Sequence, residues 1–286
     1  MTNAIRRELH VPQPRVQVWQ ALATSDALAE WMFPNDFQPE VGRRFTFQVP
    51  PNPRLNFPGL TVRCEVLECL PPSRLSFSWS AGAPVENTVV RFDLESDGDG
   101  TRIHFEHAGF DLAHAFGQQA LQGAEYGWAK MFKSLEDVVG RPSTSLTAER
   151  VLPFSPHQVF AAFERPGLLA EWWGPNGFRN TFEKFEFKPG GRWVFVMHGP
   201  NGVDYPNENL FHALEPGAKV VLEHIHNPWF TLTIALAPCG DHTQLMWVQT
   251  FENTDTAAKI LAAIGNANEE NLDRLQSVLT REHALH

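Results

Sequence analysis

The chain has 286 residues, which corresponds to about two domains at the usual ~150 residues per domain. It is 43% hydrophobic and 20% charged, a composition that supports packed cores and excludes a disordered chain. The net charge of −10 argues against nucleic acid or an anionic membrane as the main partner.

The first residues and the cysteines bear on the cellular compartment. The run Ile5-Arg6-Arg7-Glu8 is followed by Pro12, so a signal peptide is not expected, and no stretch reaches the ~20 apolar residues of a membrane span. Three cysteines lack the paired spacing of a zinc or redox site: Cys64, Cys69 and Cys239. We therefore expect a cytoplasmic protein without a cofactor or a metal.

Internal similarity divides the chain into two copies of one unit. Placing residues 152–175 over residues 11–34 gives nine identities in 24 positions, and one of them pairs Trp31 with Trp172. The similarity resumes at later positions, and Gly and Pro interrupt the segment between the copies. We predict a diverged first domain at 1–140, a second domain at 146–286 and a linker at about 141–145.

Each copy begins with a short strand and two short helices. In the second copy, Ser155-Pro156-His157-Gln158 is typical of a helix start with a capping box. Alternating apolar and polar residues then predict strands with one buried face. In the first copy the apolar positions are Phe45, Phe47 and Val49; Leu75, Phe77 and Trp79; Val90, Phe92 and Leu94; and Ile103, Phe105 and His107.

A long amphipathic helix closes each copy. Its apolar stripe is Leu121, Trp128, Phe132, Leu135 and Val139 in the first copy, and Leu261, Ile264, Leu272, Leu275 and Leu279 in the second. This order of elements predicts an α+β fold, in which a curved antiparallel sheet wraps around the C-terminal helix. Such an arrangement leaves a cavity between the sheet and the helix.

Several motifs resemble the activator-of-Hsp90-ATPase homologue-like branch of the START-like (SRPBCC, helix-grip) superfamily. In the second copy they are Glu171-Trp172-Trp173-Gly174-Pro175-x-Gly177-Phe178, Lys188-Pro189-Gly190-Gly191-Arg192-Trp193, Glu223-His224 and Pro228-x-Phe230. The first copy is similar through Glu30-Trp31, Gly42-x-Arg44-Phe45 and Gly127-Trp128. The resemblance implies two tandem helix-grip domains, each with a pocket for a small, mostly apolar ligand under the long helix.

Two histidines of the second copy are the candidates for chemistry. Aligning Leu75-x-Phe77-x-Trp79 with Val220-x-Leu222-x-His224 places His224 on the inward face, and strand alternation places His226 beside it. The favoured interpretation is a pair of hydrogen-bonded structural histidines. A ligand-contacting or acid/base role is the second. Metal binding is the weakest, because no third ligand has a suitable spacing.

The first copy supplies one polar candidate, His107, which aligns with Gln249 and for which a structural role is favoured. On the long helix Trp128 aligns with Asn268, which either faces solvent or makes the second cavity more polar and roomier. The Pro-rich segment 50–58 is either a lid or a long loop. The full predicted lining is Trp193, Phe195, Tyr205, Leu222, His224, His226, Trp247, Gln249 and Asn268, with Phe47, Phe77, Trp79, Phe92, Phe105, His107 and Trp128.

These features favour a cytosolic protein that binds a small hydrophobic or aromatic molecule, mainly in the second copy. One alternative is a cyclase- or hydrolase-like enzyme that uses His224 and His226 as acid and base. The other is a stress-response protein with a chaperone partner, which the residues do not support. We expect the two copies to pack on each other and expect neither a nucleic acid nor a membrane as partner.

Overall fold

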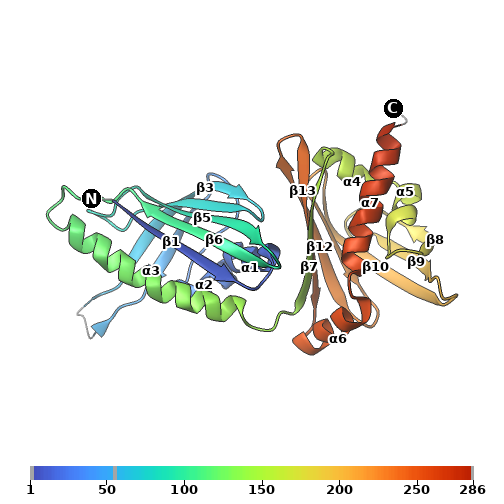
Figure 1. The fold of residues 1–286 in the computed structure, drawn as a ribbon, viewed down its shortest axis with the longest axis horizontal. Coiled ribbons are helices and arrows are strands. Elements are labelled where there is room, and N and C mark those ends of the chain that lie inside the picture. Colours follow the sequence, from blue (N-terminus) through green and yellow to red (C-terminus); the bar gives the residue numbers. More distant parts are fainter. Residues whose placement is uncertain (1–2, 54–56, 285–286) are drawn as a thin grey trace. The chain divides into compact units, whose positions relative to one another are not determined.

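Two compact units make up the chain in the computed structural model, which describes residues 3–53 and 57–284 (Figure 1). The first unit spans Met1–Arg141 and the second Pro142–His286. The boundary lies within the segment predicted as the linker. The Pro-rich segment 50–58 of the first unit includes residues 54–56, which lie outside the described residues, so its interpretation as a lid or a loop stays open.

The first unit has a six-stranded antiparallel sheet closed by one long helix. The sheet order is β1-β6-β5-β4-β3-β2. Its elements are β1 (Ala4–Val11), α1 (Arg15–Leu22), α2 (Ser25–Trp31), β2 (Arg44–Val49), β3 (Leu60–Leu70), β4 (Arg74–Trp79), β5 (Thr88–Asp97), β6 (Gly100–Ala108) and α3 (Gly117–Val139).

The second unit repeats this order with one additional strand and one additional helix, in a sheet ordered β7-β13-β12-β11-β10-β9-β8. Its elements are β7 (Ser145–Leu152), α4 (Pro156–Glu164), α5 (Pro166–Trp172), β8 (Arg179–Phe185), β9 (Arg192–His198), β10 (Asp204–Glu215), β11 (Lys219–His224), β12 (Phe230–Cys239), β13 (His242–Phe251), α6 (Thr254–Ile264) and α7 (Ala267–Ala284). The predicted α+β fold with two tandem helix-grip domains is confirmed.

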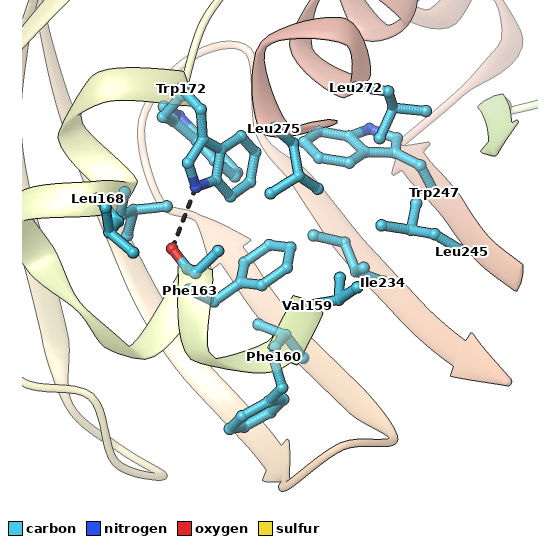
Figure 2. Close-up of a cluster of buried hydrophobic side chains, with 14 of the residues drawn as sticks. Val159, Phe160, Phe163, Leu168, Trp172, Ile234, Leu245, Trp247, Leu272 and Leu275 are labelled. Carbon is cyan, nitrogen blue, oxygen red and sulfur yellow. Dashed lines mark hydrogen bonds between the residues drawn. The ribbon is translucent and has the colours of Figure 1, made fainter. Parts of the chain in front are cut away.

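The core of each unit lies between the concave sheet and its helices. The predicted capping box at Ser155 and Gln158 starts α4. Trp172 is fully buried in the second core, and its indole N–H donates to the carbonyl oxygen of Ala162 at 3.0 Å (Figure 2). The matching Trp31 donates to Ala21 at 2.9 Å in the first unit. The paired tryptophans thus hold the two short helices together in both copies.

The C-terminal helical region of the second unit is broken, whereas the apolar stripe predicted one helix. Gly265 has φ 51° and ψ −118°, a conformation that a residue with a side chain rarely adopts, and it ends α6 before α7 begins. Figure 1 shows α6 turned away from the axis of α7. Leu272 and Leu275 of the stripe are fully buried, but Leu261 of α6 is 53% exposed.

Polar side chains tie α7 to the turn that follows α5. The side-chain Oδ1 of Asn271 accepts a hydrogen bond from the N–H of Gly174 at 2.5 Å, and the carboxylate of Glu270 accepts one from the N–H of Asn176 at 2.9 Å. The guanidinium of Arg274 donates to four main-chain carbonyls at 2.5 to 3.0 Å: those of Glu171, Gly174, Pro175 and Phe178. The carbonyl of Glu171 is in the last turn of α5, where intrahelical donors are missing, and the other three lie in the segment that follows the helix.

We call the four hydrogen bonds from Arg274 to main-chain carbonyls the Arg274 clamp. Removing this clamp should lower the stability of the protein by a measurable amount. Replacing Arg274→Met removes the donors of four carbonyls, and we expect the free energy of unfolding to fall by about 1–3 kcal/mol because partly buried acceptors lose their partners. Urea unfolding of the full chain measures this change. Arg281→Met is the matched control, because the exposed Arg281–Glu171 ion pair contributes less than ~1 kcal/mol. Equal losses in the two variants would contradict the clamp.

Candidate functional site

An apolar cavity of about 250 Å³ lies between the sheet and α3 of the first unit. Three predicted lining residues contribute to it: Trp79 from β4, His107 from β6 and Trp128 from α3. The other walls are aliphatic and aromatic side chains from β2, β3 and the segments that follow α2 and β4. The cavity therefore occupies the position that a helix-grip fold predicts.

Small residues on α3 make room for this cavity. Ala120, Ala124 and Gly127 lie four and three positions apart, so they share one face of the helix, and all three line the cavity. A Cβ atom added at Gly127 would meet no other atom within 4 Å. These three small residues were not among the predicted lining residues, although their helical spacing was a usable signal.

The one polar side chain of the lining, His107, is fully engaged within the protein. It is 1% exposed, and its Nδ1 accepts a hydrogen bond from the indole N–H of Trp128 at 2.9 Å. Its Nε2 lies 2.8 Å from the hydroxyl oxygen of Thr88, which donates to the carbonyl of Trp79 at 2.7 Å. Because Nδ1 is an acceptor, Nε2 carries the proton and donates to Thr88.

Burial keeps His107 neutral. Desolvation of the charged form lowers the pKa of this histidine to about 3, so the imidazole is uncharged at neutral pH. A protonated ring would also lose its ability to accept the indole hydrogen bond of Trp128. The favoured prediction of a structural role for His107 agrees with these contacts.

The remaining predicted residues of the first unit form the core behind the cavity. Phe47, Phe77, Phe92 and Phe105 are at most 2% exposed, and they pack ring against ring rather than lining the cavity. Phe105 also lies 4.4 Å from Trp128 between ring centroids. These phenylalanines therefore support the cavity wall without facing a ligand.

In the second unit His224 is a buried, hydrogen-bonded histidine at the end of β11. It is 6% exposed, and its Nδ1 lies 3.0 Å from the side-chain oxygen of Asn209 on β10. Its ring stacks on Phe230, with 4.9 Å between ring centroids. Burial, and secondarily the charge of His226, lowers the pKa of His224 to about 4. These contacts fit the favoured structural interpretation.

The prediction that His226 shares the inward face with His224 is wrong. Strand β11 ends at His224, so the alternation that placed His226 stops two residues before it. His226 is exposed in the following loop, where its Nε2 lies 3.6 Å from a carboxylate oxygen of Glu208. The two rings are 6.2 Å apart. One histidine is buried and the other is in solvent, so they do not form an acid/base pair around one interior site.

Most of the other predicted residues of the second unit belong to its packed core. Trp193, Phe195, Leu222 and Trp247 are at most 3% exposed and are part of one cluster, to which Leu272 and Leu275 of α7 also belong (Figure 2). Gln249 is 9% exposed on the same face of β13 as Trp247. Tyr205 is 41% exposed, with its ring 5.9 Å from Phe178.

Asn268 does not enlarge the interior of the second unit in the way that its alignment with Trp128 had suggested. Asn268 is half-buried, and the inward amide of α7 is Asn271, which binds the Gly174 turn. Two aligned positions differ together. The helix carries Trp128 in the first unit and the smaller Asn268 in the second, whereas the strand carries Phe105 in the first unit and the larger Trp247 in the second. The side-chain volume lost on the helix is thus offset by a larger side chain on the sheet.

A metal site and a membrane-spanning helix are both absent from residues 3–53 and 57–284. No group of three or more His, Cys, Asp or Glu side chains there is arranged to hold a metal ion. Within the same residues, no helix combines the length and the apolar character needed to cross a bilayer. The three cysteines are free, and burial raises the pKa of the Cys69 thiol to about 11, which makes it a weak nucleophile at neutral pH.

Comparison with known proteins assigns the family. The chain matches the family described as activator of Hsp90 ATPase homolog 1-like protein over residues 12–140 and again over residues 153–280. Both halves are covered, so the chain belongs to this family as a tandem repeat. No curated protein matches the chain.

Solved structures resemble one half of the chain at a time. Protein MLL2253 from Mesorhizobium loti is 29% identical, over 48% of this chain and 96% of that protein, with a TM-score of 0.42. Protein BH1534 from Bacillus halodurans is 27% identical, over 49% and 99%, with a TM-score of 0.40. A protein from Arthrobacter aurescens is 23% identical, over 49% and 87%, with a TM-score of 0.46.

The buried His107 predicts an acid-sensitive first domain. Its pKa is about 3 in the folded protein and near the ordinary 6.5 of a free histidine when unfolded, so between these values the unfolded state binds more protons. Stability from this residue is complete above pH 6.5 and falls as the pH drops, with a slope that approaches about 1.4 kcal/mol per pH unit. Denaturant unfolding at several pH values measures the slope.

His107→Gln is the informative variant for this prediction, because the second domain carries Gln249 at the aligned position. Glutamine does not titrate, so between pH 6.5 and 5 the stability of the variant should fall less steeply than that of wild type, by the contribution of His107. A stability difference between wild type and variant that stays constant over this range would show that His107 is not held neutral by the fold.

Proposed function

We propose that this protein binds a small, neutral hydrophobic molecule in the first domain, between the sheet and α3. The observation that carries the proposal is the apolar cavity of about 250 Å³ bounded by Ala120, Ala124 and Gly127 on one side and Trp79 on the other. The sequence had favoured the second domain because of His224, His226 and Asn268. His226 and Asn268 do not lie where that preference requires, so the proposal takes the first domain.

The lining specifies a ligand without charge. None of the residues around the cavity carries a charge at neutral pH, and both ring nitrogens of His107 are already occupied by Trp128 and Thr88. A carboxylate or ammonium group would lose its hydration without gaining a partner there. A hydrocarbon-like or aromatic molecule loses nothing of this kind and gains from burial of its apolar surface.

The cavity volume favours a compact ligand. Ligand pockets usually begin at about 300 Å³, and the cavity of about 250 Å³ is slightly smaller. Several of its walls, such as Phe33, Val49 and Leu60, are only half-buried, so part of a ligand would remain at the surface. We therefore propose a small aromatic or short aliphatic molecule as ligand, rather than a long lipid chain.

Gly127→Leu tests this proposal. The leucine side chain would enter open space beside the cavity, because a Cβ at Gly127 has no neighbour within 4 Å. We expect the dissociation constant for the neutral fluorophore N-phenyl-1-naphthylamine to rise at least about tenfold, equivalent to ~1.4 kcal/mol. Fluorescence titration measures it. Replacing a helical glycine should also stabilise α3 by up to ~1 kcal/mol, so loss of binding would not reflect unfolding.

Gly123→Leu is the matched control for the cavity. Gly123 lies on the same helix and its Cβ position is also open, but it is exposed and does not line the cavity. Both variants should gain helix stability, while only Gly127→Leu should lose fluorophore binding. Equal affinity in the two variants, or no binding to wild type at all, would refute a ligand site at this position.

A further inference from the structure

The outer face of the first sheet has a hollow beside an interruption in the strand pairing. The ladder between β3 and β4 ends at Val66, and the chains meet again at an isolated bridge between Arg63 and Ser80. Within the interruption the hydroxyl oxygen of Ser78 accepts a hydrogen bond from the N–H of Glu65 at 2.9 Å. The hollow has a volume of about 380 Å³, which is within the usual range of ligand pockets. We call it the outer pocket.

The outer pocket lies on the opposite side of the sheet from the apolar cavity. Ser78 is between the buried Phe77 and Trp79 on β4, and Arg63 is likewise between two buried residues on β3, so strand alternation directs both side chains outward. The segment after β4 forms the remaining wall. There Asn87 has φ 55°, and its N–H donates to the hydroxyl oxygen of Ser80 at 3.0 Å.

Two opposite charges line the outer pocket without pairing. The guanidinium of Arg63 and the carboxylate of Glu86 both belong to its lining. Neither side chain makes a hydrogen bond or an ion pair to any described residue, so more than 4.0 Å separates their charged atoms. Arg44 is different, because its Nε donates to the carboxylate of Glu65 at 3.1 Å. The lining thus offers one unpaired cation and one unpaired anion among the residues that the structure describes.

The second domain has a structural ion pair at the positions that correspond to Arg44 and Arg63. Counting back three residues from the register shifts of β3 and β10 aligns Arg63 with Glu208. Glu208 forms an ion pair with Arg192, which aligns with Arg44. In the first domain a second guanidinium replaces this carboxylate. Two neighbouring cations repel each other, and an anion bound between them removes the repulsion.

We propose that the outer pocket binds a small zwitterion, with its carboxylate on Arg63 and its ammonium group on Glu86. A guanidinium donates two parallel hydrogen bonds to a carboxylate, and a carboxylate accepts hydrogen bonds from an ammonium group. The hydroxyls of Ser78 and Ser80 each accept a main-chain N–H, so each O–H can donate to the ligand. This ligand differs in class from the hydrocarbon-like ligand of the apolar cavity, and the proposal does not depend on that cavity.

A series of ω-amino acids tests the charge pairing. Glycine, 4-aminobutanoate and 6-aminohexanoate carry the same two charges at increasing separation, so the member that spans from Arg63 to Glu86 should bind best. Chemical-shift titration of the isotope-labelled full chain measures each dissociation constant. We expect about 10 mM or lower for the best member. Its N-acetylated form keeps only the carboxylate and should bind at least about fivefold more weakly.

Removal of either charge should weaken binding. Arg63→Gln and Glu86→Gln should each raise the dissociation constant of the best ω-amino acid at least about fivefold, because each removes one ionic partner of the ligand. Arg43→Gln and Glu40→Gln are the matched controls, because these exposed side chains do not line the pocket. Both controls should leave the dissociation constant unchanged. Urea unfolding should give similar stabilities for all four variants.

Reversal of one charge should change the ligand that is preferred. Wild type should bind the ω-amino acid more tightly than the dicarboxylate of matching length, chosen from succinate to adipate. Glu86→Arg should bind the dicarboxylate at least about fivefold more tightly than the ω-amino acid, because both ends of the pocket are then cationic. A gain of affinity for one ligand cannot result from loss of folding.

Four results would overturn the proposal. They are no titratable shift with any ω-amino acid, equal binding of the zwitterion and its N-acetylated form, equal binding by wild type and Arg63→Gln, and an unchanged ligand preference in Glu86→Arg. Binding of N-phenyl-1-naphthylamine reports on the apolar cavity and should be the same in wild type and Arg63→Gln. The two proposals can therefore fail separately.

Discussion

Each domain depends on filling the space between a concave antiparallel sheet and a single helical segment packed across it. The two copies meet this constraint from opposite sides. In the first domain the large ring comes from the helix, as Trp128, and packs on Phe105 of the sheet. In the second the aligned helix position is Asn268, and the strand carries Trp247 instead. Because protein interiors are close-packed, a change on one side requires a change on the other.

This exchange also decides where polar groups are satisfied. Trp128 reaches His107 from the helix, and the resulting chain of hydrogen bonds through Thr88 leaves no ring nitrogen of that histidine free. In the second domain Trp247 belongs to strand β13, and its indole N–H has no acceptor among the described residues. The residue aligned with His107 on that strand is Gln249. The first domain therefore presents a cavity in which both ring nitrogens of His107 are already hydrogen-bonded, whereas the second keeps unpaired indole donors inside a packed core.

Patterns that extend over many residues were readable from the sequence, and single-residue departures were not. The repeat, the strand alternation and the paired Trp31 and Trp172 correctly predicted the fold, because each rests on periodic burial. His226 was misplaced because β11 ends at His224, and a strand end is set by the following turn rather than by alternation. The break at Gly265 was hidden by apolar residues that continue the helical period on both sides. Asn268 was overinterpreted because its effect depends on Trp247.

The hydrogen bonds of the second domain explain why its helix can break without loss of the fold. Arg274 and Asn271 fix α7 to the turn after α5, so the core no longer needs the preceding helical turns to stay aligned. In the first domain Ser134 aligns with Arg274, and α3 runs unbroken over its 23 residues. A straight helix with Ala120, Ala124 and Gly127 on its inner face leaves an open cavity. In the second domain the hydrogen bonds hold α7, and α6 packs on a small separate cluster that contains Leu146 and Phe251. The residues on the inner face of the helix thus shape the cavity of the first domain, and the hydrogen bonds of α7 determine where the helix of the second domain can break.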